Sequence, residues 1–184
     1  ELCKEKSSAF KAGYHNICDI GMKRISLARK LYLELYPDTT ADLGFKQYTL
    51  KEVSQSTLDK MESFDNSGFI TDTTVYVEFG ANTVLTTWLI HDGYGFNNDM
   101  EMLELGGYTA YWCKTHLYFI NPDLTEDAIK SLIEKYNSQG NFNPQNIVLF
   151  GYSFNYVEME NLKTNVKMLR DSEKNLKINL DIRY

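Results

Sequence analysis

Hydrophobic residues near the start of the chain recur every three or four positions, which is the spacing of one helical face. The stripe comprises Phe10, Tyr14, Ile17, Gly21, Ile25, Ala28, Tyr32 and Leu35. Ser7 or Ser8 can cap this helix and Pro37-Asp38 ends it, so the pattern predicts one amphipathic helix over residues 10–35. The chain does not begin with Met, and the apolar side of this helix needs a surface to cover. We therefore expect a fragment of a larger protein.

The next hundred residues change pattern several times. Residues 44–50 alternate loosely and predict a short strand. Residues 51–74 are polar and predict a linker with one helical turn around residues 56–63. Residues 75–90 are apolar, and their length and the break at residues 93–95 favour one buried helix over a strand.

Three short runs with β-like alternation follow, at residues 101–105, 108–113 and 116–120. Gly106-Gly107 is a suitable two-residue hairpin turn between the first two runs, and Lys114-Thr115 can turn the next pair. This part of the chain is expected to form an antiparallel meander.

The last third of the chain alternates helix and strand patterns. Thr125 is a suitable N-cap for a helix over residues 126–136, and residues 146–150 form a continuous apolar run typical of a buried parallel strand. Residues 158–170 have one apolar side, and residues 176–182 alternate. The expected fold is therefore α/β: a long amphipathic helix, then a mixed sheet in which the meander is followed by a right-handed β-α-β unit.

Composition and charge narrow the function. The 184 residues carry a net charge of −6, which argues against a strongly basic nucleic-acid clamp. Lys23, Arg24, Arg29 and Lys30 are nevertheless candidates for DNA-backbone contacts, although we favour the solvated face of an amphipathic helix. Three widely spaced cysteines suggest a reducing cytoplasm, and no apolar run approaches the ~20 residues of a membrane span.

Ser153 lies between a predicted strand and a predicted helix, the position of a hydrolase nucleophile. The pattern Gly151-Tyr-Ser153-Phe-Asn155 lacks the second glycine of Gly-x-Ser-x-Gly, and no histidine follows it. The sequence therefore favours a strand-to-helix loop in which Ser153 or Asn155 caps the helix.

Two pairs of residues have the spacing of half zinc sites, namely His15/Cys18 and Cys113/His116. Neither is a Cys-x-x-Cys knuckle, so buried cysteines and surface histidines are the favoured interpretation, and no metal is expected. His91-Asp92 is interpreted as a solvated turn rather than a catalytic dyad.

No cofactor loop can be identified. Gly93-Tyr94-Gly95 lacks the third glycine of a phosphate-binding turn, and neither Asp-Pro-Pro-Tyr nor Phe-x-Gly-x-Gly occurs anywhere. We therefore assign no catalytic and no cofactor-binding residue.

Several ordered blocks resemble the Mod subunits of type III restriction–modification systems, which are adenine-specific DNA methyltransferases of the β motif order. The N-terminal blocks are residues 1–14 (ELCKEKSSAFKAGY), Ile17-Cys18, Gly21 and residues 23–25 (KRI). The later blocks are residues 44–46 (GFK), residues 86–89 (TTWL), residues 93–95 (GYG) and residues 162–165 (LKTN). The sequence departs from the family at Gln47-Tyr48 and at residues 49–52.

The resemblance implies that residues 1–50 are the tail of the methyltransferase catalytic domain, 51–74 a linker and 75–184 a C-terminal α/β domain. The parent would transfer a methyl group from S-adenosylmethionine to adenine N6 of a flipped-out base. The catalytic and cofactor motifs of such a parent lie upstream, so the fragment alone is expected to be inactive and to bind no cofactor. Its implied work is assembly: Mod homodimerisation, docking of the restriction subunit, or support of DNA binding.

Two other hypotheses remain. One is a self-contained, non-catalytic α/β interaction module, which predicts that the helix at residues 10–35 packs on the chain's own sheet. The other, weaker one is a small α/β enzyme that uses Ser153 or the His/Cys pairs.

Overall fold

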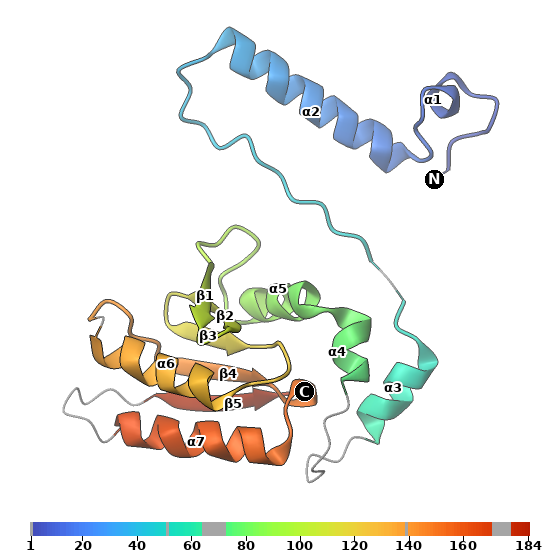
Figure 1. Ribbon diagram of the computed structural model, residues 1–184. Helices are drawn as coiled ribbons and strands as arrows, with labels where there is room; N and C mark the ends of the chain where they lie inside the picture. The colour runs from blue at the N-terminus through green and yellow to red at the C-terminus, as the bar shows by residue number, and fades with distance from the viewer. Residues whose placement is uncertain (1, 51, 64–72, 139, 171–177) are drawn as a thin grey trace. The chain divides into compact units, whose positions relative to one another are not determined.

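The chain folds as two compact units, Glu1–Lys51 and Glu52–Tyr184 (Figure 1). The computed structural model describes residues 2–50, 52–63, 73–138, 140–170 and 178–184. Each unit is described separately below.

The first unit contains two helices, α1 (Ser8–Lys11) and α2 (Ile17–Leu35), so the prediction of one continuous helix is wrong. Gly13 interrupts the helical path with a φ of 88°, a conformation that favours glycine. Asn16 then restarts it through a capping box: its side-chain oxygen accepts from the Asp19 N–H at 2.9 Å, and the Asp19 carboxylate accepts from the Asn16 N–H at 3.1 Å. The hydrophobic period continues across the break, which is why periodicity alone missed it.

The strand predicted at residues 44–50 is also wrong, because this segment has neither helix nor strand. The only β-type pairing described outside the named strands is an isolated bridge between Leu2 and Asn16. A strand needs a second strand to satisfy its backbone groups, and no strand pairing is described for residues 44–50 within this unit. Leu50 is almost fully exposed.

The second unit begins with three helices, α3 (Gln55–Glu62), α4 (Thr74–Phe79) and α5 (Ala81–His91). Helix α3 confirms the helical turn expected near residues 56–63, whereas residues 64–72 of the predicted linker lie outside the described residues. The single helix predicted at residues 75–90 is wrong, because Gly80 adopts a φ of 74° and divides it into α4 and α5.

The five strands form one mixed sheet in the order β1-β2-β3-β4-β5. Their bounds are β1 (Glu101–Leu105), β2 (Tyr108–Cys113), β3 (His116–Phe119), β4 (Asn146–Phe150) and β5 (Asn179–Arg183). The first three strands pair antiparallel, whereas β3, β4 and β5 pair parallel. The predicted meander and the parallel β-α-β unit are confirmed, and residues 176–177 of the last predicted strand lie outside the described residues.

The β1–β2 hairpin turns at Gly106-Gly107, as the sequence predicts. Both residues have positive φ, 54° and 88°, which is the requirement of a type I′ turn. A Cβ atom at Gly106 would lie 2.6 Å from the carbonyl oxygen of Asp127, so glycine also allows the turn to approach the backbone of the following helix.

That helix is α6 (Glu126–Ser138), and α7 (Tyr156–Arg170) follows β4 after a 3-10 turn, η1 (Gly151–Ser153). Thr125 caps α6 by accepting from the Ala128 N–H at 3.2 Å, as predicted. Asn155 and Glu158 form a capping box at the start of α7, which confirms one of the two cap alternatives at this loop.

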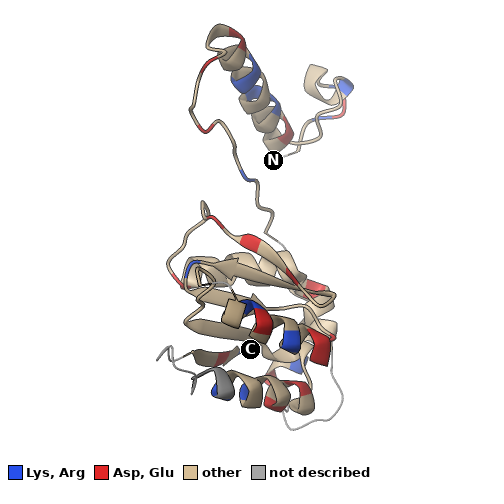
Figure 2. Ribbon diagram, turned by 60° about the vertical axis from the view of Figure 1, so that its left-hand side comes forward, with Lys and Arg blue, Asp and Glu red and all other residues tan. Residues whose placement is uncertain are grey.

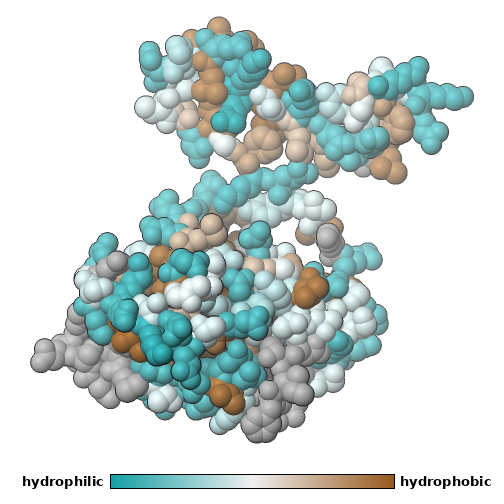
Figure 3. Space-filling view, viewed as in Figure 1, coloured by the Kyte–Doolittle hydropathy of each residue, from teal (hydrophilic) through white to brown (hydrophobic). Residues whose placement is uncertain are grey.

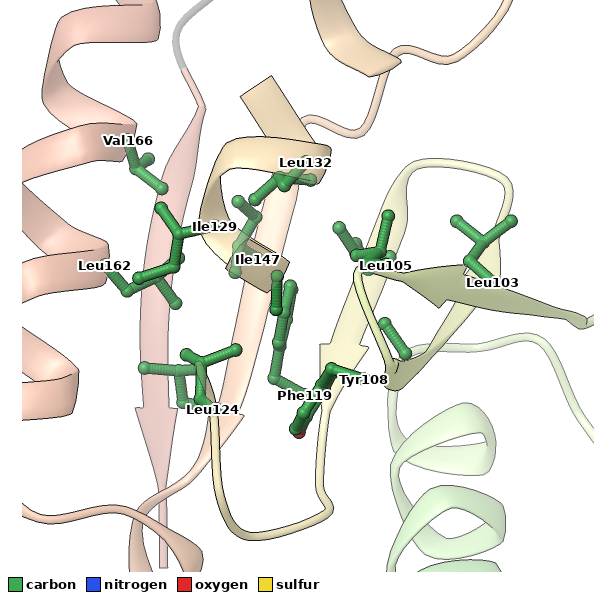
Figure 4. Close-up of a cluster of buried hydrophobic side chains, with 14 of the residues drawn as sticks. Leu103, Leu105, Tyr108, Phe119, Leu124, Ile129, Leu132, Ile147, Leu162 and Val166 are labelled. Carbon is green, nitrogen blue, oxygen red and sulfur yellow. The ribbon is translucent and has the colours of Figure 1, made fainter. Parts of the chain in front are cut away.

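Helices cover both faces of the sheet. Side chains of α6 and α7 pack on one face, where Leu132, Leu162 and Val166 meet Phe119 and Ile147 (Figure 4). On the other face, residues of α4 and α5 pack against alternate residues of β2, β3 and β4. The second unit is therefore a three-layer sandwich with a buried sheet, in which successive strand residues serve opposite cores.

Candidate functional site

A cluster of polar side chains surrounds Asp92, directly after α5, on the sheet face that α4 and α5 cover. The guanidinium of Arg183 on β5 donates two hydrogen bonds to this carboxylate, at 3.0 and 2.9 Å. Tyr118 Oη of β3 donates to the same carboxylate at 2.8 Å. Only 6% of the Asp92 side chain is exposed. The interpretation of Asp92 as part of a solvated turn is therefore wrong, whereas the neighbouring His91 is exposed.

The electrostatics of the cluster favour an ionised Asp92. Burial works toward a raised pKa, but hydrogen bonds from Arg183, Tyr118 and His91 outweigh it, and the pKa of Asp92 lies below its ordinary value. Burial and the hydrogen bond to Asp92 raise the pKa of Tyr118 far above its ordinary value, so Tyr118 remains a neutral donor. A carboxylate at the C-terminal end of a helix is disfavoured by the helix dipole, and the bidentate Arg183 compensates for this.

Arg183 connects two elements, α5 and β5, at this point. Its Nε donates to Asp181 of the same strand at 2.7 Å, and its guanidinium lies over the Trp88 ring of α5 with 5.5 Å to the ring centroid. It therefore fastens the end of α5 to strand β5.

His116 forms the outer part of the cluster with two hydroxyl groups. Its Nδ1 lies 2.5 Å from Tyr94 Oη and 3.2 Å from Thr115 Oγ1, while its Nε2 is 3.9 Å from the Asp92 carboxylate. The last distance exceeds a hydrogen bond, so the groups do not form a nucleophile–base–acid relay in this geometry. Burial lowers the pKa of His116, and the nearby Arg183 lowers it further against the opposing effect of Asp92.

An apolar hollow of about 180 Å³ lies beside this cluster. Its lining comes from α3, α4, α5, β4, η1 and the last residue, and comprises Met61, Val75, Phe79, Thr83, Val84, Thr87, Trp88, Phe150, Tyr152 and Tyr184. Trp88 is shared by the hollow and the Asp92 cluster. Its described lining residues offer hydroxyl groups and aromatic rings but no carboxylate, histidine or lysine that could act as a general acid or base.

The four predicted DNA-backbone residues lie on α2, where Figure 2 colours lysine and arginine positions blue. All four side chains are exposed. Seven residues make about two helical turns, so Lys23 and Lys30 share one face. By the same spacing Arg24 lies in line with Ile17 and Leu31, on the apolar side. Lys30 is 3.9 Å from Glu34 on the same helix. The four side chains therefore surround the helix and do not form one basic patch.

Ser153 is fully buried, and its hydroxyl donates to the Ile120 carbonyl at 2.6 Å. The hydroxyl links η1 to the end of β3 and cannot be reached by a substrate in this structure. The structure therefore contradicts the hypothesis of a hydrolase that uses Ser153.

The two His/Cys pairs lie in different surroundings. His15 and Cys18 are at the start of α2, whereas Cys113 on β2 is completely buried and burial raises its pKa. His116 is engaged with Tyr94 and Thr115. Among the described residues, no three His, Cys, Asp or Glu side chains come together as a metal site.

Arg183, Tyr118 and Tyr94 were not identified from the sequence. Arg183 and Asp92 are 91 positions apart, so only the sheet brings them together. The one local signal is a charged Asp92 directly after an apolar helix.

No helix in the described ranges is both long enough and apolar enough to cross a membrane.

Comparison with known proteins gives a consistent result. The model of a family described as "Type III R-M EcoP15I C-terminal domain" matches residues 79–176. The chain is 31% identical over 183 residues to the type III restriction-modification enzyme EcoP15I Mod subunit of Escherichia coli, covering 100% of this chain and 27% of that protein. It is 28% identical to the EcoPI Mod subunit of Escherichia phage P1, covering 100% of the chain and 28% of the relative. It is 30% identical to the StyLTI Mod subunit of Salmonella typhimurium, covering 96% of this chain and 30% of that protein. The chain spans between a quarter and a third of the length of these curated relatives.

Proposed function

The chain belongs to the type III restriction–modification EcoP15I C-terminal domain family, and from this membership we propose that it acts as the C-terminal, non-catalytic part of a Mod-type DNA adenine-N6 methyltransferase. The observation that carries the proposal is the alignment of the whole chain with about a quarter of a Mod subunit. The parent would bind S-adenosylmethionine and DNA, and this part would serve assembly.

The first unit supports the proposal through its open helix. Helix α2 contains no buried residue, and exposed hydrophobic residues lie along it (Figure 3). They include Ile17, Ile25, Leu27, Leu31 and Leu35. We propose that residues 1–50 complete the catalytic domain, whose sheet this helix covers, with residues 51–74 as linker and 75–184 as the C-terminal domain.

The basic residues of α2 keep a restricted role in this proposal. Lys23 and Lys30 share a face, so they are the stronger candidates for contacts to the DNA backbone in the parent. Arg29 lies on a different part of the surface, and Arg24 lies in the apolar stripe, where its methylene groups can cover apolar surface.

The second unit supports an assembly role because two polar groups that could have served catalysis, Asp92 and Ser153, serve the fold instead. The Asp92 carboxylate is occupied by Arg183 and Tyr118, and the Ser153 hydroxyl by the Ile120 carbonyl. We propose that its partners are a second Mod subunit and the restriction subunit.

The experiment compares three proteins: the full-length parent, the parent without residues 52–184, and the isolated chain. Calorimetry with S-adenosylmethionine should give binding heat for both parent forms and none for the isolated chain. Tritiated S-adenosylmethionine should label adenine in DNA only with a parent form, and the restriction subunit should co-purify with the full-length parent but not with the truncated one. Micromolar binding of S-adenosylmethionine by the isolated chain, or undiminished assembly of the truncated parent, would contradict the proposal.

A further inference from the structure

Among the residues that the structure describes, strand β5 has a pairing partner on one side only. It is the last strand in the sheet order, with β4 on one side only. The Asn179 N–H donates to the Gln145 carbonyl at 2.7 Å, so the backbone groups of Asn179 face β4. Because backbone groups alternate along a strand, those of Asp181 and Arg183 also face β4, while those of Leu180 and Ile182 point away from the sheet.

This edge lacks two of the devices that usually prevent strand pairing, proline and lysine. Residues 179–183 read Asn-Leu-Asp-Ile-Arg and contain neither proline nor lysine. The opposite edge strand, β1, carries two glutamates, Glu101 and Glu104. An open edge with a mixed charge pattern is a template for another extended segment.

We propose that a second copy of this chain pairs with β5 in antiparallel orientation, about a two-fold axis at Ile182. This inference rests on the proposed function, which already includes the pairing of two Mod subunits, and names the surface that they use. The two Ile182 residues would exchange N–H···O=C bonds, since their backbone groups point outward. The two five-stranded sheets would then form one continuous sheet.

Charge complementarity selects this register. An axis at Ile182 places Asp181 opposite Arg183 of the second copy, twice by symmetry, at the close spacing of a non-hydrogen-bonded pair. An axis at Asp181 would instead place two like-charged carboxylates opposite each other, which is unfavourable. An axis at Leu180 would place Asp181 opposite Asn179 and form no ion pair at these positions.

The side chains of Asp181 and Arg183 can form these ion pairs without losing their present contacts. Arg183 already donates to Asp92 and Asp181, and its guanidinium has five N–H donors in a fixed fork. Asp181 is the more open of the two side chains, with 42% exposed, so its second carboxylate oxygen can reach across the edge.

The first test replaces Ile182 by proline in the 184-residue chain. Proline is tolerated where the N–H faces away from the sheet, so Ile182→Pro removes both central hydrogen bonds and leaves the β4–β5 ladder intact. The matched control is Met102→Pro on β1. Leu105 and Tyr108 close a two-residue hairpin and are hydrogen-bonded, so Met102, three positions earlier, also has its N–H directed outward.

Sedimentation velocity over a concentration series gives the dimer dissociation constant of each form. We expect a reversible dimer for the unchanged chain and for Met102→Pro, and a dissociation constant at least about tenfold higher for Ile182→Pro. Thermal unfolding of both variants checks that the fold is retained. A chain that is monomeric at all concentrations, or a dimer that Ile182→Pro leaves unchanged, would overturn the inference.

The second test uses cysteine cross-linking and does not depend on proline. In a Cys3→Ser, Cys18→Ser background, Ile182→Cys should form an intermolecular disulfide, because hydrogen-bonded partners lie about 5.5 Å apart at Cα, within disulfide reach. Met102→Cys is the control and should not cross-link. If Ile182→Cys forms a dimer but the peptide map shows no disulfide between the two introduced cysteines, the register with its axis at Ile182 is contradicted. Calorimetry and restriction-subunit binding are separate readouts, so failure of the edge pairing is distinguishable from failure of the proposed function.

Discussion

Helices α2 and α6 have the same kind of sequence pattern and opposite surroundings. Both are amphipathic, and both begin at a side chain that caps the helix, Asn16 and Thr125. Helix α6 buries Ala128, Ile129, Leu132 and Tyr136 against the sheet, whereas α2 buries no residue. An amphipathic stripe therefore shows that a helix requires a partner surface, but not that the surface belongs to the same unit.

The difference also separates local stability from tertiary stability. An isolated helix is marginal even with good caps, because most helix stability in proteins comes from packing of the apolar face. The second unit supplies that packing to α6 and α7. The described residues of the first unit give α2 a capping box and exposed side-chain pairs, but bury none of its residues.

The largest expected contrast comes from truncating one leucine in each helix. Leu132→Ala on α6, at 1% exposure, removes core contacts and should lower the free energy of unfolding by about 3 kcal/mol. Leu27→Ala on α2, at 52% exposure, should change it by less than about 0.5 kcal/mol. Both tryptophans, Trp88 and Trp112, are in the second unit, so their fluorescence during urea unfolding measures its stability. Equal destabilisation by the two variants would show that α2 is packed like α6.

The second contrast compares ion pairs. Arg183→Met leaves the Asp92 carboxylate buried without its main partner and should cost about 2–3 kcal/mol in the same urea experiment. Lys30→Ala on α2 breaks an exposed pair with Glu34 and should leave the unfolding midpoint unchanged. If Arg183→Met lowers the free energy of unfolding no more than Lys30→Ala does, the Asp92 cluster does not stabilise the fold.

A third contrast uses the two capping boxes. Asn155→Ala removes the cap of α7 and should lower the free energy of unfolding by about 1 kcal/mol. Asn16→Ala should reduce the helical signal in far-UV circular dichroism while leaving the tryptophan transition in place. A shift of that transition by Asn16→Ala would contradict this expectation, because the cap of α2 would then contribute to the stability of the second unit.

The smallest effect is a pH dependence confined to the second unit. Burial lowers the pKa of His116 below the ordinary value of 6.5, so the unfolded chain binds this proton more readily than the folded one. The free energy of unfolding should therefore decrease as the pH falls below about 6.5, and His116→Gln should reduce this dependence on pH. The pKa of Asp92 is also lowered, so its contribution persists above pH 3.8 and is lost only in stronger acid. If the unfolding free energy of His116→Gln depends on pH between 7 and 5 as strongly as that of the unchanged chain, other groups cause the dependence.

The strands and the hairpin were predictable because their signals are local. Alternation over residues 101–120 and the Gly106-Gly107 turn specify the meander without reference to other parts of the chain. The continuous apolar run at residues 146–150 likewise indicated a buried parallel strand.

The helix breaks and the polar cluster were not predicted, for different reasons. The hydrophobic period continues across Gly13 and Gly80, so a single helix fits the side chains although the backbone turns at each glycine. Asn16 with Asp19 three positions later is a local signal that could have located the start of α2. The Asp92–Arg183 pair has no such signal, because it depends on where α5 and β5 meet on the sheet.

Hydrogen exchange measured by mass spectrometry tests the central claim most directly, that α2 presents an apolar face which the described residues of the first unit leave exposed. In the Ile182→Pro form, to keep the chain monomeric, amides of α2 should exchange at least about a hundredfold faster than those of α6. Protection of α2 equal to that of α6 would contradict the account and would favour a self-contained module whose first helix packs on its own sheet.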